Sequence, residues 1–199
     1  MYSFSGKPFI DLRMCFNSLL PESLNDRLGK KITKFWINEL IKKPYYHDKI
    51  EFEITDNCFY FGLKEKISKK YNFLKKTEKT NFYKRLKILT NDALKNYRQN
   101  FLQMNNDIIN LEKFRAQTIK KYILENNNEI KFSKALLEEC KEQGLIPFAK
   151  QARNAFIAKK ILISLVDINV LSKKSYFHIL GKLKTISHDY ISDQKSLDN

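Results

Sequence analysis

From Glu78 to Asn126 the chain contains neither proline nor glycine, the two residues that most often end a helix. Apolar residues recur there at steps of three and four between Phe82 and Leu111. This spacing aligns them along one face of a helix. The sequence therefore predicts one very long helix, or two helices joined near Thr90–Asp92, where a helix N-cap could form. The near-heptad spacing is also compatible with a coiled coil, but we expect packing against the other helices of the domain.

Two short segments alternate between apolar and polar residues, which is the period of a β-strand with one buried face. The first is Phe9–Asn17 and the second is Ile50–Ile54. Asp56–Asn57 has the composition of a turn, after which Cys58–Phe61 is expected to add a further strand. These segments predict a small sheet of two or three strands.

Start and stop signals predict the remaining helices. Asn25 begins a helix that ends before Pro44, and Ser172 begins one that ends near Ser187. Gly144 is expected to stop a helix over residues 133–143. Pro147 fits the first turn of the next helix, which runs to about Val166, and the polar tail 192–199 is expected to fray.

The predicted fold class is α+β and predominantly helical: a bundle with one long helix or helix pair and the small sheet. At 43% hydrophobic and 13% aromatic residues, the 199-residue chain can build a real core. We expect a single domain over residues 1–199, a fragment of a larger multidomain enzyme. Its parts are a sheet-containing region (1–62), a long helical arm (78–126) and C-terminal helices (131–190).

The formal net charge of +15 raises the possibility of nucleic acid or another anionic polymer as partner. Only six of the 37 basic residues are arginine, however, and the chain is also rich in asparagine and isoleucine. That bias is typical of an AT-rich coding sequence, whereas phosphate readers favour the bidentate guanidinium of arginine. We therefore expect generic surface lysine and keep a basic polymer-binding module as the alternative.

Other classes lack their signatures. No apolar run approaches the length of a membrane span, and the N-terminus does not resemble a signal peptide, so we expect no membrane contact and a cytoplasmic location. Cys15, Cys58 and Cys140 form no plausible zinc set with the three histidines and are expected to stay reduced. The five scattered glycines provide no nucleotide-binding loop, and no metal site is predicted.

The polar face of the predicted sheet is the first candidate site. Asp11, Arg13 and Asn17 would project from one strand, and Glu51 and Glu53 would join them from the next. Arginine can clamp a carboxylate and acids can receive an ammonium group, so this set suits a zwitterion. The alternative is an ordinary solvated face with weak ion pairs.

A second candidate lies at the start of the helix after Pro147. Arg153 and Phe156 share a face with small residues, and Phe148 lies in the first turn, where a helix attracts anions. The alternative is a helix that packs closely through its alanines.

Three blocks of sequence resemble the phosphoenolpyruvate synthase-like (PEP-utilising) family. The stretch from Phe4 to Pro21 (FSGKPFIDLRMCFNSLLP) resembles the family's pattern G-x-P-Y-I-D-V-R-V-S-F-N-S-F-x-P. Two further blocks follow in the expected order: residues 46–54, and residues 145–149 with Arg153 and 156–158. Together they run from residue 4 to about 165, and the lysine- and asparagine-rich composition is similar to that of the L-glutamine kinases of capsular phosphoramidate biosynthesis.

The resemblance implies a relay. An ATP-grasp domain uses ATP and Mg²⁺ to charge a histidine on a swivelling domain, and the phosphohistidine phosphorylates the side-chain amide of L-glutamine. This chain corresponds to the acceptor-binding region, which binds no cofactor itself. Arg13, or else Arg153, would then bind the carboxylate of glutamine; Glu51, Glu53 or Asp11 would bind its ammonium, and Asn17 its amide. Glu51 or Glu53 could also accept a proton during transfer.

The chain departs from the family's catalytic parts. It has no ATP-grasp segment, and Ser187–His188 lacks the glycines that precede the phosphorylated histidine, so His188 is not expected to carry the phosphoryl group. The sequence predicts a phosphotransferase fragment that is inactive without those domains of the same protein. A scaffold that docks neighbouring domains through the long helix is a further alternative.

Overall fold

The fold is helical throughout its body. The computed structural model describes residues 2–4, 6–125 and 129–183. In these ranges the helices are α1 (Leu12–Ser18), α2 (Asp26–Lys42), α3 (Leu63–Lys70), α4 (Lys76–Lys95), α5 (Tyr97–Glu125), α6 (Glu129–Glu139), α7 (Ile146–Asp167) and α8 (Lys173–Gly181). Shorter turns are a 3₁₀ turn, η1 (Pro44–Tyr46), and two π-helical turns, η2 (Ile50–Ile54) and η3 (Cys140–Leu145).

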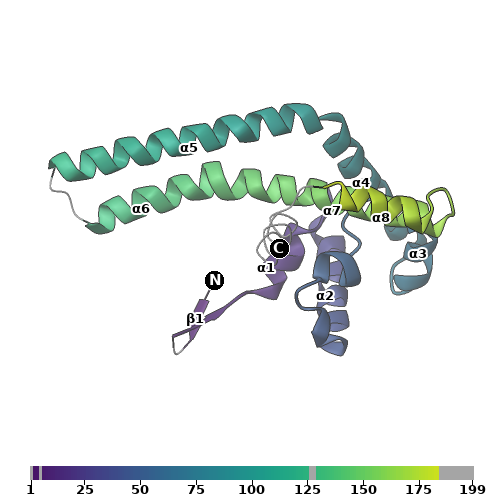
Figure 1. Cartoon of the computed structure of the whole chain (residues 1–199). Coiled ribbons are helices and arrows are strands. Elements are labelled where there is room, and N and C mark those ends of the chain that lie inside the picture. Colours follow the sequence, from purple (N-terminus) through teal and green to yellow (C-terminus); the bar gives the residue numbers. More distant parts are fainter. Residues whose placement is uncertain (1, 5, 126–128, 184–199) are drawn as a thin grey trace, which may run out of the picture.

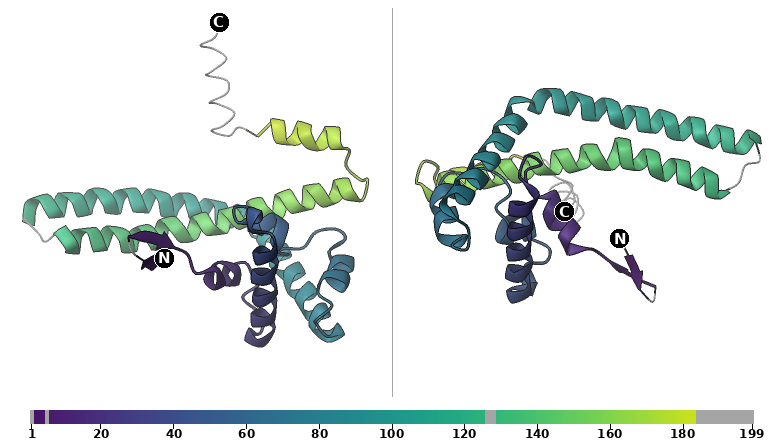
Figure 2. Two further views of the ribbon diagram at one scale, coloured as in Figure 1. Left: turned by 90° about the horizontal axis from the view of Figure 1, so that it is seen from below. Right: turned by 180° about the vertical axis from the view of Figure 1, so that it is seen from behind.

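The molecule has two parts, which we call the helical body and the helical arm (Figure 1). The body consists of α1 to α4, η2 and the C-terminal half of α7. The arm is a long antiparallel pair, with α5 on one side and α6, η3 and the start of α7 on the other. In the views from below and from behind, the arm extends away from the body (Figure 2). α8 follows the C-terminal end of α7, on the side opposite the tip of the arm (Figure 2).

The core lies in the body. Its largest buried side chains are Trp36, Tyr71, Phe16 and Phe82, whose rings pack against one another with centroids 5.4–6.4 Å apart. α2 begins at an Asn25 cap and contributes Leu28, Ile32, Trp36 and Leu40, at the spacing expected of one buried helix face. By contrast, α5 buries none of the side chains that the structure describes. The body is therefore the part that can hold a preformed site.

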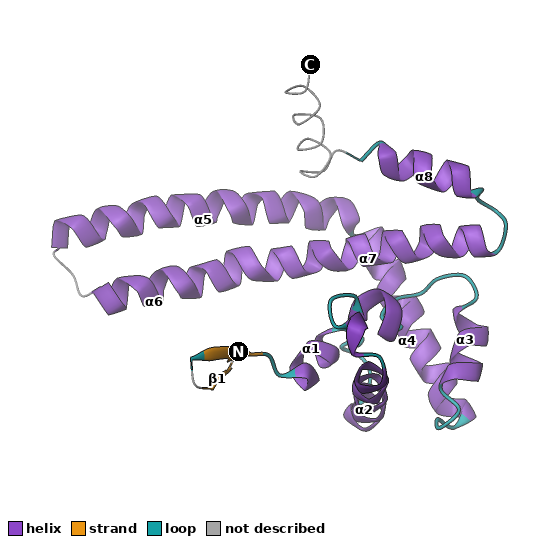
Figure 3. Ribbon diagram, turned by 60° about the horizontal axis from the view of Figure 1, so that its bottom comes forward, coloured by secondary structure: helices purple, strands orange, loops and turns teal. Residues whose placement is uncertain are grey.

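The predicted α+β class is wrong, because none of the expected strands forms (Figure 3). Leu12–Ser18 is α1, begun by Asp11, whose carboxylate accepts the Arg13 N–H. Of the apolar face expected there only Phe16 is buried, while Ile10 and Met14 are 63% and 68% exposed. Residues 50–54 form η2. In both segments the alternation is too short to distinguish a strand from an amphipathic turn of helix.

Residues 58–61 are irregular rather than a strand. The N–H groups of Phe59 and Phe61 donate to the hydroxyls of Thr90 in α4 (2.8 Å) and Ser164 in α7 (3.2 Å). Helix side chains thus satisfy backbone groups that a neighbouring strand would otherwise pair. The extended residues of the described chain are a short N-terminal hairpin, β1 (Tyr2–Phe4) and β2 (Lys7–Phe9), which turns at Gly6 and projects from the body.

Two helix limits in the middle of the chain also differ from expectation. The long helical segment is divided at Asn96, not near Thr90–Asp92, because Thr90 is buried inside α4. Gly144 ends no helix: α6, η3 and α7 follow one another directly, and a Cβ on Gly144 would lie 3.4 Å from Leu111 of α5. The wider η3 turn comes just before Pro147, which lacks an N–H, and Ile146 donates to Lys141 five residues back.

Other limits are confirmed. α2 ends at Lys42, before Pro44, and Pro147 lies in the first turn of α7. The Ser172 hydroxyl accepts the Ser175 N–H and caps α8 as expected, but α8 ends at Gly181, with Lys182 as its C-cap, and not near Ser187. His188 and the tail 192–199 lie outside the described residues.

Candidate functional site

The predicted polar face does not exist as a surface, because its members lie on different elements. The Asp11 carboxylate is paired with the Arg13 guanidinium within the first turn of α1 (2.9 and 3.2 Å), and Arg13 is 76% exposed. Asn17 accepts a hydrogen bond from Thr33 of α2 at 2.8 Å. Glu51 and Glu53 belong to η2, which packs chiefly against α2, α7 and η1. Since the two segments are not paired strands, their side chains are not aligned on one face.

The second predicted set is also divided. Arg153 in α7 donates to the carbonyl of Ser18 and so caps the end of α1. Burial lowers the pKa of Arg153, which nevertheless stays charged. Phe156 packs edge-on against Phe52 of η2, with ring centroids 5.4 Å apart, whereas Phe148 is 68% exposed. Arg153 and Phe156 thus join elements of the body, and Phe148 shares no site with them.

The most concentrated polar group in the body surrounds Asp56, whose side chain is fully buried. Its Oδ1 accepts from the Tyr60 hydroxyl (2.6 Å) and lies 3.1 Å from Lys66 Nζ. Its Oδ2 accepts from the Tyr71 hydroxyl (2.8 Å) and from Lys70 Nζ (2.9 Å). Every strong acceptor position of this carboxylate is thereby occupied, as a buried charge requires.

Further hydrogen bonds hold the partners of Asp56 in place. The indole N–H of buried Trp36 donates to the Tyr71 hydroxyl at 2.8 Å, so one line of hydrogen bonds connects α2, α3 and Asp56. Lys70 Nζ also donates to the Ile54 carbonyl at 2.7 Å. Because these partners are themselves held by the core, the geometry around Asp56 is set by packing.

The electrostatics follow from burial and from the lysines. Burial by itself would raise the pKa of Asp56, but Lys70, Lys66 and Lys160 outweigh it and the pKa is lowered. Burial raises the pKa of Tyr60, and the nearby Asp56 carboxylate raises it further. Burial lowers the pKa of Lys70 despite its Asp56 partner. Asp56 is therefore a permanent carboxylate at physiological pH, and both tyrosines are hydrogen-bond donors.

Lys160 in α7 completes the cluster. It is only 8% exposed, and its Nζ donates to the Thr55 carbonyl at 2.6 Å. Burial lowers the pKa of Lys160 to about 8, even though Asp56 opposes the change. A buried lysine whose pKa is lowered in this way is a candidate for a functional site.

A pocket of about 230 Å³ opens beside this lysine, between η2, α3 and α7. We call it the lysine pocket. It has basic, acidic, aromatic and apolar walls, and Glu53 is the one residue of the sequence-based site sets that lines it. The lining residues are Phe52, Glu53, Tyr60, Lys66, Lys160, Ile163, Ser164 and Asp167.

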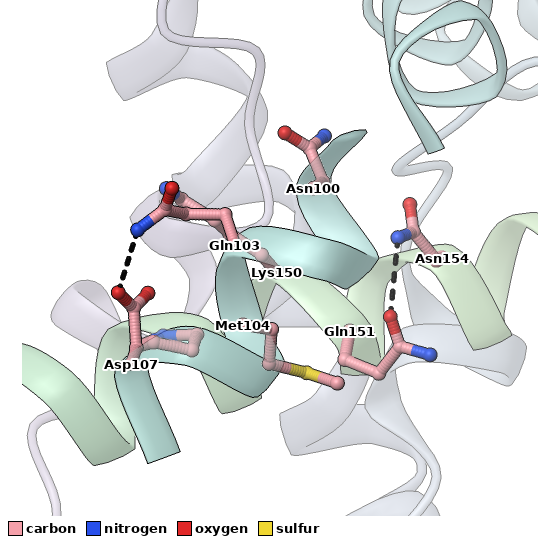
Figure 4. Close-up of a pocket in the computed structure, with 8 residues that line it drawn as sticks. Asn100, Gln103, Met104, Asp107, Lys150, Gln151 and Asn154 are labelled. Atoms are coloured by element: carbon pink, nitrogen blue, oxygen red, sulfur yellow. Dashed lines mark hydrogen bonds between the residues drawn. The ribbon is translucent and has the colours of Figure 1, made fainter. Parts of the chain in front are cut away.

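A smaller cavity of about 30 Å³ lies between α5 and α7, at the base of the arm (Figure 4). Amides dominate its walls, and several of them already bond to neighbours: Gln103 to Asp107 at 2.8 Å and Asn154 to Gln151 at 3.4 Å. The space is about that of one or two water molecules. It is too small for a substrate, so the lysine pocket is the better candidate.

In residues 2–4, 6–125 and 129–183 no cluster of three or more histidine, cysteine or acidic side chains could hold a metal ion. In the same ranges no helix combines the length and apolar character that crossing a bilayer requires. The sequence reading missed the Asp56 cluster because Asp56–Asn57 has the composition of a turn. Lys160 was also missed, because no sequence spacing distinguishes it from the other lysines.

No protein-family model, curated protein or solved structure matches the chain. The class that the fold and site define is a helical domain in which a charged, amino-acid-sized pocket adjoins a buried lysine. Its function has to be argued from that pocket.

Proposed function

We propose that this chain is the acceptor-binding region of an ATP-dependent phosphotransferase, and that the lysine pocket holds a small polar acceptor, L-glutamine in the first instance. The observation that carries the proposal is the pocket's lining. Two lysines, Lys66 and Lys160, and two acidic residues, Glu53 and Asp167, line one small recess. The resemblance to PEP synthase-like proteins gives the reaction type.

The size of the pocket supports a small acceptor. Its volume of about 230 Å³ is below the range usual for drug-sized ligands and suits a single amino acid. Phe52 and Ile163 supply an apolar wall for a short aliphatic stem. The Phe156 ring packs on Phe52, and Lys159 Nζ lies 3.9 Å from the Phe52 ring centroid. These two contacts fix the position of the Phe52 ring.

In this proposal the phosphoryl group comes from ATP through a phosphohistidine on domains outside this sequence, in the cytoplasm. The chain contributes binding and orientation, which are the main contributions of protein to phosphoryl transfer. Glu53 is exposed and lines the pocket, so it is placed to accept the proton that the acceptor nitrogen loses.

Thermal unfolding of the chain with and without L-glutamine tests the proposal. A ligand that binds only the folded state raises the melting temperature, by an amount that grows with its concentration. The rise should be absent with D-glutamine and smaller in Glu53→Gln, and should persist unchanged in the control Glu65→Gln, which changes an exposed acid of α3 outside the pocket. If neither enantiomer changes the melting temperature, the proposal fails.

If the chain instead binds an oligonucleotide with a steep loss of affinity in salt, the polymer-binding alternative gains support.

The helical arm favours a second, compatible role as a docking element. Phe101, Leu102, Ile108 and Ile109 on α5 are 40–64% exposed, and α6 adds exposed Ile130 and Leu137. Large exposed apolar side chains in series are typical of surfaces that contact another protein or domain. We propose that the arm contacts neighbouring domains of the same enzyme. Replacing Leu102 and Ile109 with serine should weaken co-purification with those domains and leave ligand binding by the body unchanged.

A further inference from the structure

The ammonium of Lys160 is buried with most of its donors unused. An ammonium has three N–H donors, and in the described residues Lys160 has one hydrogen-bond acceptor, the Thr55 carbonyl. No carboxylate of the described residues lies within ion-pair distance of its Nζ. A buried charge without a counter-ion costs several kcal/mol in general, so the site calls for an anion.

Asp56 cannot fill this role. Its oxygens already receive Tyr60, Tyr71, Lys66 and Lys70, and Lys160 is directed to the neighbouring carbonyl. Three lysines thus gather around one carboxylate. The buried part of the cluster carries more positive than negative charge, and the two lysines that line the lysine pocket, Lys66 and Lys160, stand next to open space.

The acidic residues of the pocket lie at its surface. Glu53 and Asp167 are both exposed. Neither forms an ion pair or a side-chain hydrogen bond that the structure records in its described residues. The pocket therefore has one buried charge, the ammonium of Lys160, whereas Lys66, Glu53 and Asp167 are exposed at its rim, and neither acid neutralises Lys160 by direct contact.

We infer that the lysine pocket binds an α-amino acid with its carboxylate inward: Lys160 and Lys66 receive the carboxylate, and Glu53 and Asp167 receive the ammonium at the rim. The carboxylate supplies the anion that Lys160 lacks, and Lys66 can share it while keeping Asp56. The side chain of the ligand then lies along Phe52 and Ile163. Lys160 is thus the residue that selects for a carboxylate. The inference takes its first test ligand, glutamine, from the proposed function but does not depend on that identity.

The test is a comparison of three ligands by calorimetry on the full chain. L-Glutamine carries both charges, 4-carbamoylbutanoate lacks the amine, and 4-aminobutanamide lacks the carboxylate. With the unchanged chain, each deletion should weaken binding at least about tenfold, the usual loss when a buried charged partner is left unpaired. In Lys160→Met, glutamine should lose most of its advantage over 4-aminobutanamide, because only the exposed Lys66 still meets the carboxylate, whereas loss of the amine should still weaken binding.

Variants of the two acidic residues at the rim of the pocket should give the reciprocal result. In the double variant Glu53→Gln/Asp167→Asn, removing the ligand's amine should cost little and removing its carboxylate should still cost tenfold. Such non-additivity identifies which protein group meets which ligand group. The matched control is Lys150→Met, an exposed lysine of the same helix outside the pocket, which should behave as the unchanged chain. Equal losses in Lys160→Met and the unchanged chain would overturn the inference.

Two further outcomes separate the inference from the proposed function. If glutamine fails to bind but another L-amino acid shows the same pattern, the inference stands and the glutamine kinase proposal falls. If no L-amino acid binds, or if inorganic phosphate alone occupies the pocket, the inference is wrong. Lys66→Met, at the more exposed of the two lysines (45%), gives an independent variant should Lys160→Met not fold, and should weaken carboxylate binding in the same direction.

Discussion

Lys160 donates a hydrogen bond of 2.6 Å to the backbone carbonyl of Thr55, a residue 105 positions earlier in the chain. This contact connects α7 to the segment that follows η2 and places a buried ammonium beside Asp56. Although α7 belongs in part to the arm, its C-terminal half thereby forms one wall of the lysine pocket. Most of the behaviour that we expect of this molecule depends on that connection.

Asp56→Asn should be among the most destabilising single substitutions. It leaves Lys70 and Lys66 without their shared carboxylate, and breaking a buried charged network generally costs about 3–5 kcal/mol. Urea unfolding monitored by Trp36 fluorescence measures the loss. The control Asp48→Asn, at an exposed residue, should change stability by less than about 0.5 kcal/mol. Similar midpoints for both variants would show that the Asp56 cluster does not stabilise the body.

The same cluster predicts the response to acid. Because the pKa of Asp56 is lowered in the folded state, its contribution to stability is complete above the usual range of an aspartate. It is lost as the pH falls through the lowered folded pKa. Acid titration of the unchanged chain should therefore show a loss of stability that is largely absent in Asp56→Asn. Parallel acid profiles for the two proteins would contradict this assignment.

Lys160 predicts a dependence on alkaline pH. Its charged form persists below its pKa of about 8, so binding of a carboxylate should weaken as the pH rises through that value, and Lys160→Met should abolish the dependence. Calorimetric titrations with 4-carbamoylbutanoate, which has no amine of its own to titrate, at pH 6, 7, 8 and 9 would measure it. The titratable groups around Lys160 are Asp56, Cys58, Tyr60, Lys66, Lys70, Glu53, Asp167 and Lys159. Persistence of the pH dependence in Lys160→Met would assign it to one of these groups.

The charge of Lys160 favours ligand binding, but without ligand the same charge lowers the stability of the fold. A base whose pKa is lowered from 10.5 to about 8 by folding binds its proton more tightly in the unfolded chain, which destabilises the fold below pH 8. A shift of this size corresponds to about 3 kcal/mol. Lys160→Met should therefore be as stable as the unchanged chain or more stable at pH 7, and this advantage should shrink toward pH 10. A large loss of stability at pH 7 would mean that the bond to Thr55 outweighs the cost of burying the charge.

Tyr71→Phe should cost about 1–3 kcal/mol, because the hydroxyl both donates to Asp56 and accepts from the Trp36 indole. The variant leaves the buried indole N–H without a partner. Chemical denaturation gives the size of the loss, and Tyr97→Phe, on the exposed surface of α5, serves as the matched control. A loss no greater than that of the control would mean that the line of hydrogen bonds from Trp36 contributes nothing to stability.

The three cysteines should differ in reactivity. Burial raises the pKa of Cys58 to about 11, so this thiol should resist a disulfide reagent until the chain unfolds. Cys140, exposed in η3, should react first, and Cys15 more slowly. Timed labelling with a chromogenic disulfide reagent distinguishes the three through the variants Cys15→Ser and Cys140→Ser. Rapid reaction of Cys58 in the folded chain would show that the body opens readily.

The prediction from sequence succeeded where local rules decide the outcome. Asn25 and Ser172 cap helices because a short polar side chain at that position satisfies free N–H groups, whatever lies around it. The 3.6-residue spacing in α2 and in the long segment 78–126 identified helices because many turns repeat the same pattern. It failed at residues 9–17 and 50–54, where one or two turns of helix alternate like a strand.

The candidate site shows the same division. By itself the sequence determined helical content, the main caps and the excess of lysine, all of which follow from composition and from neighbours along the chain. Only the tertiary structure decided that Asp56 is buried rather than in a turn, and that Lys160 and Lys66 share a pocket with Glu53. The reason is that burial and charge pairing depend on residues more than a hundred positions apart, as in Lys160 and Thr55, and no periodicity records such distant partners.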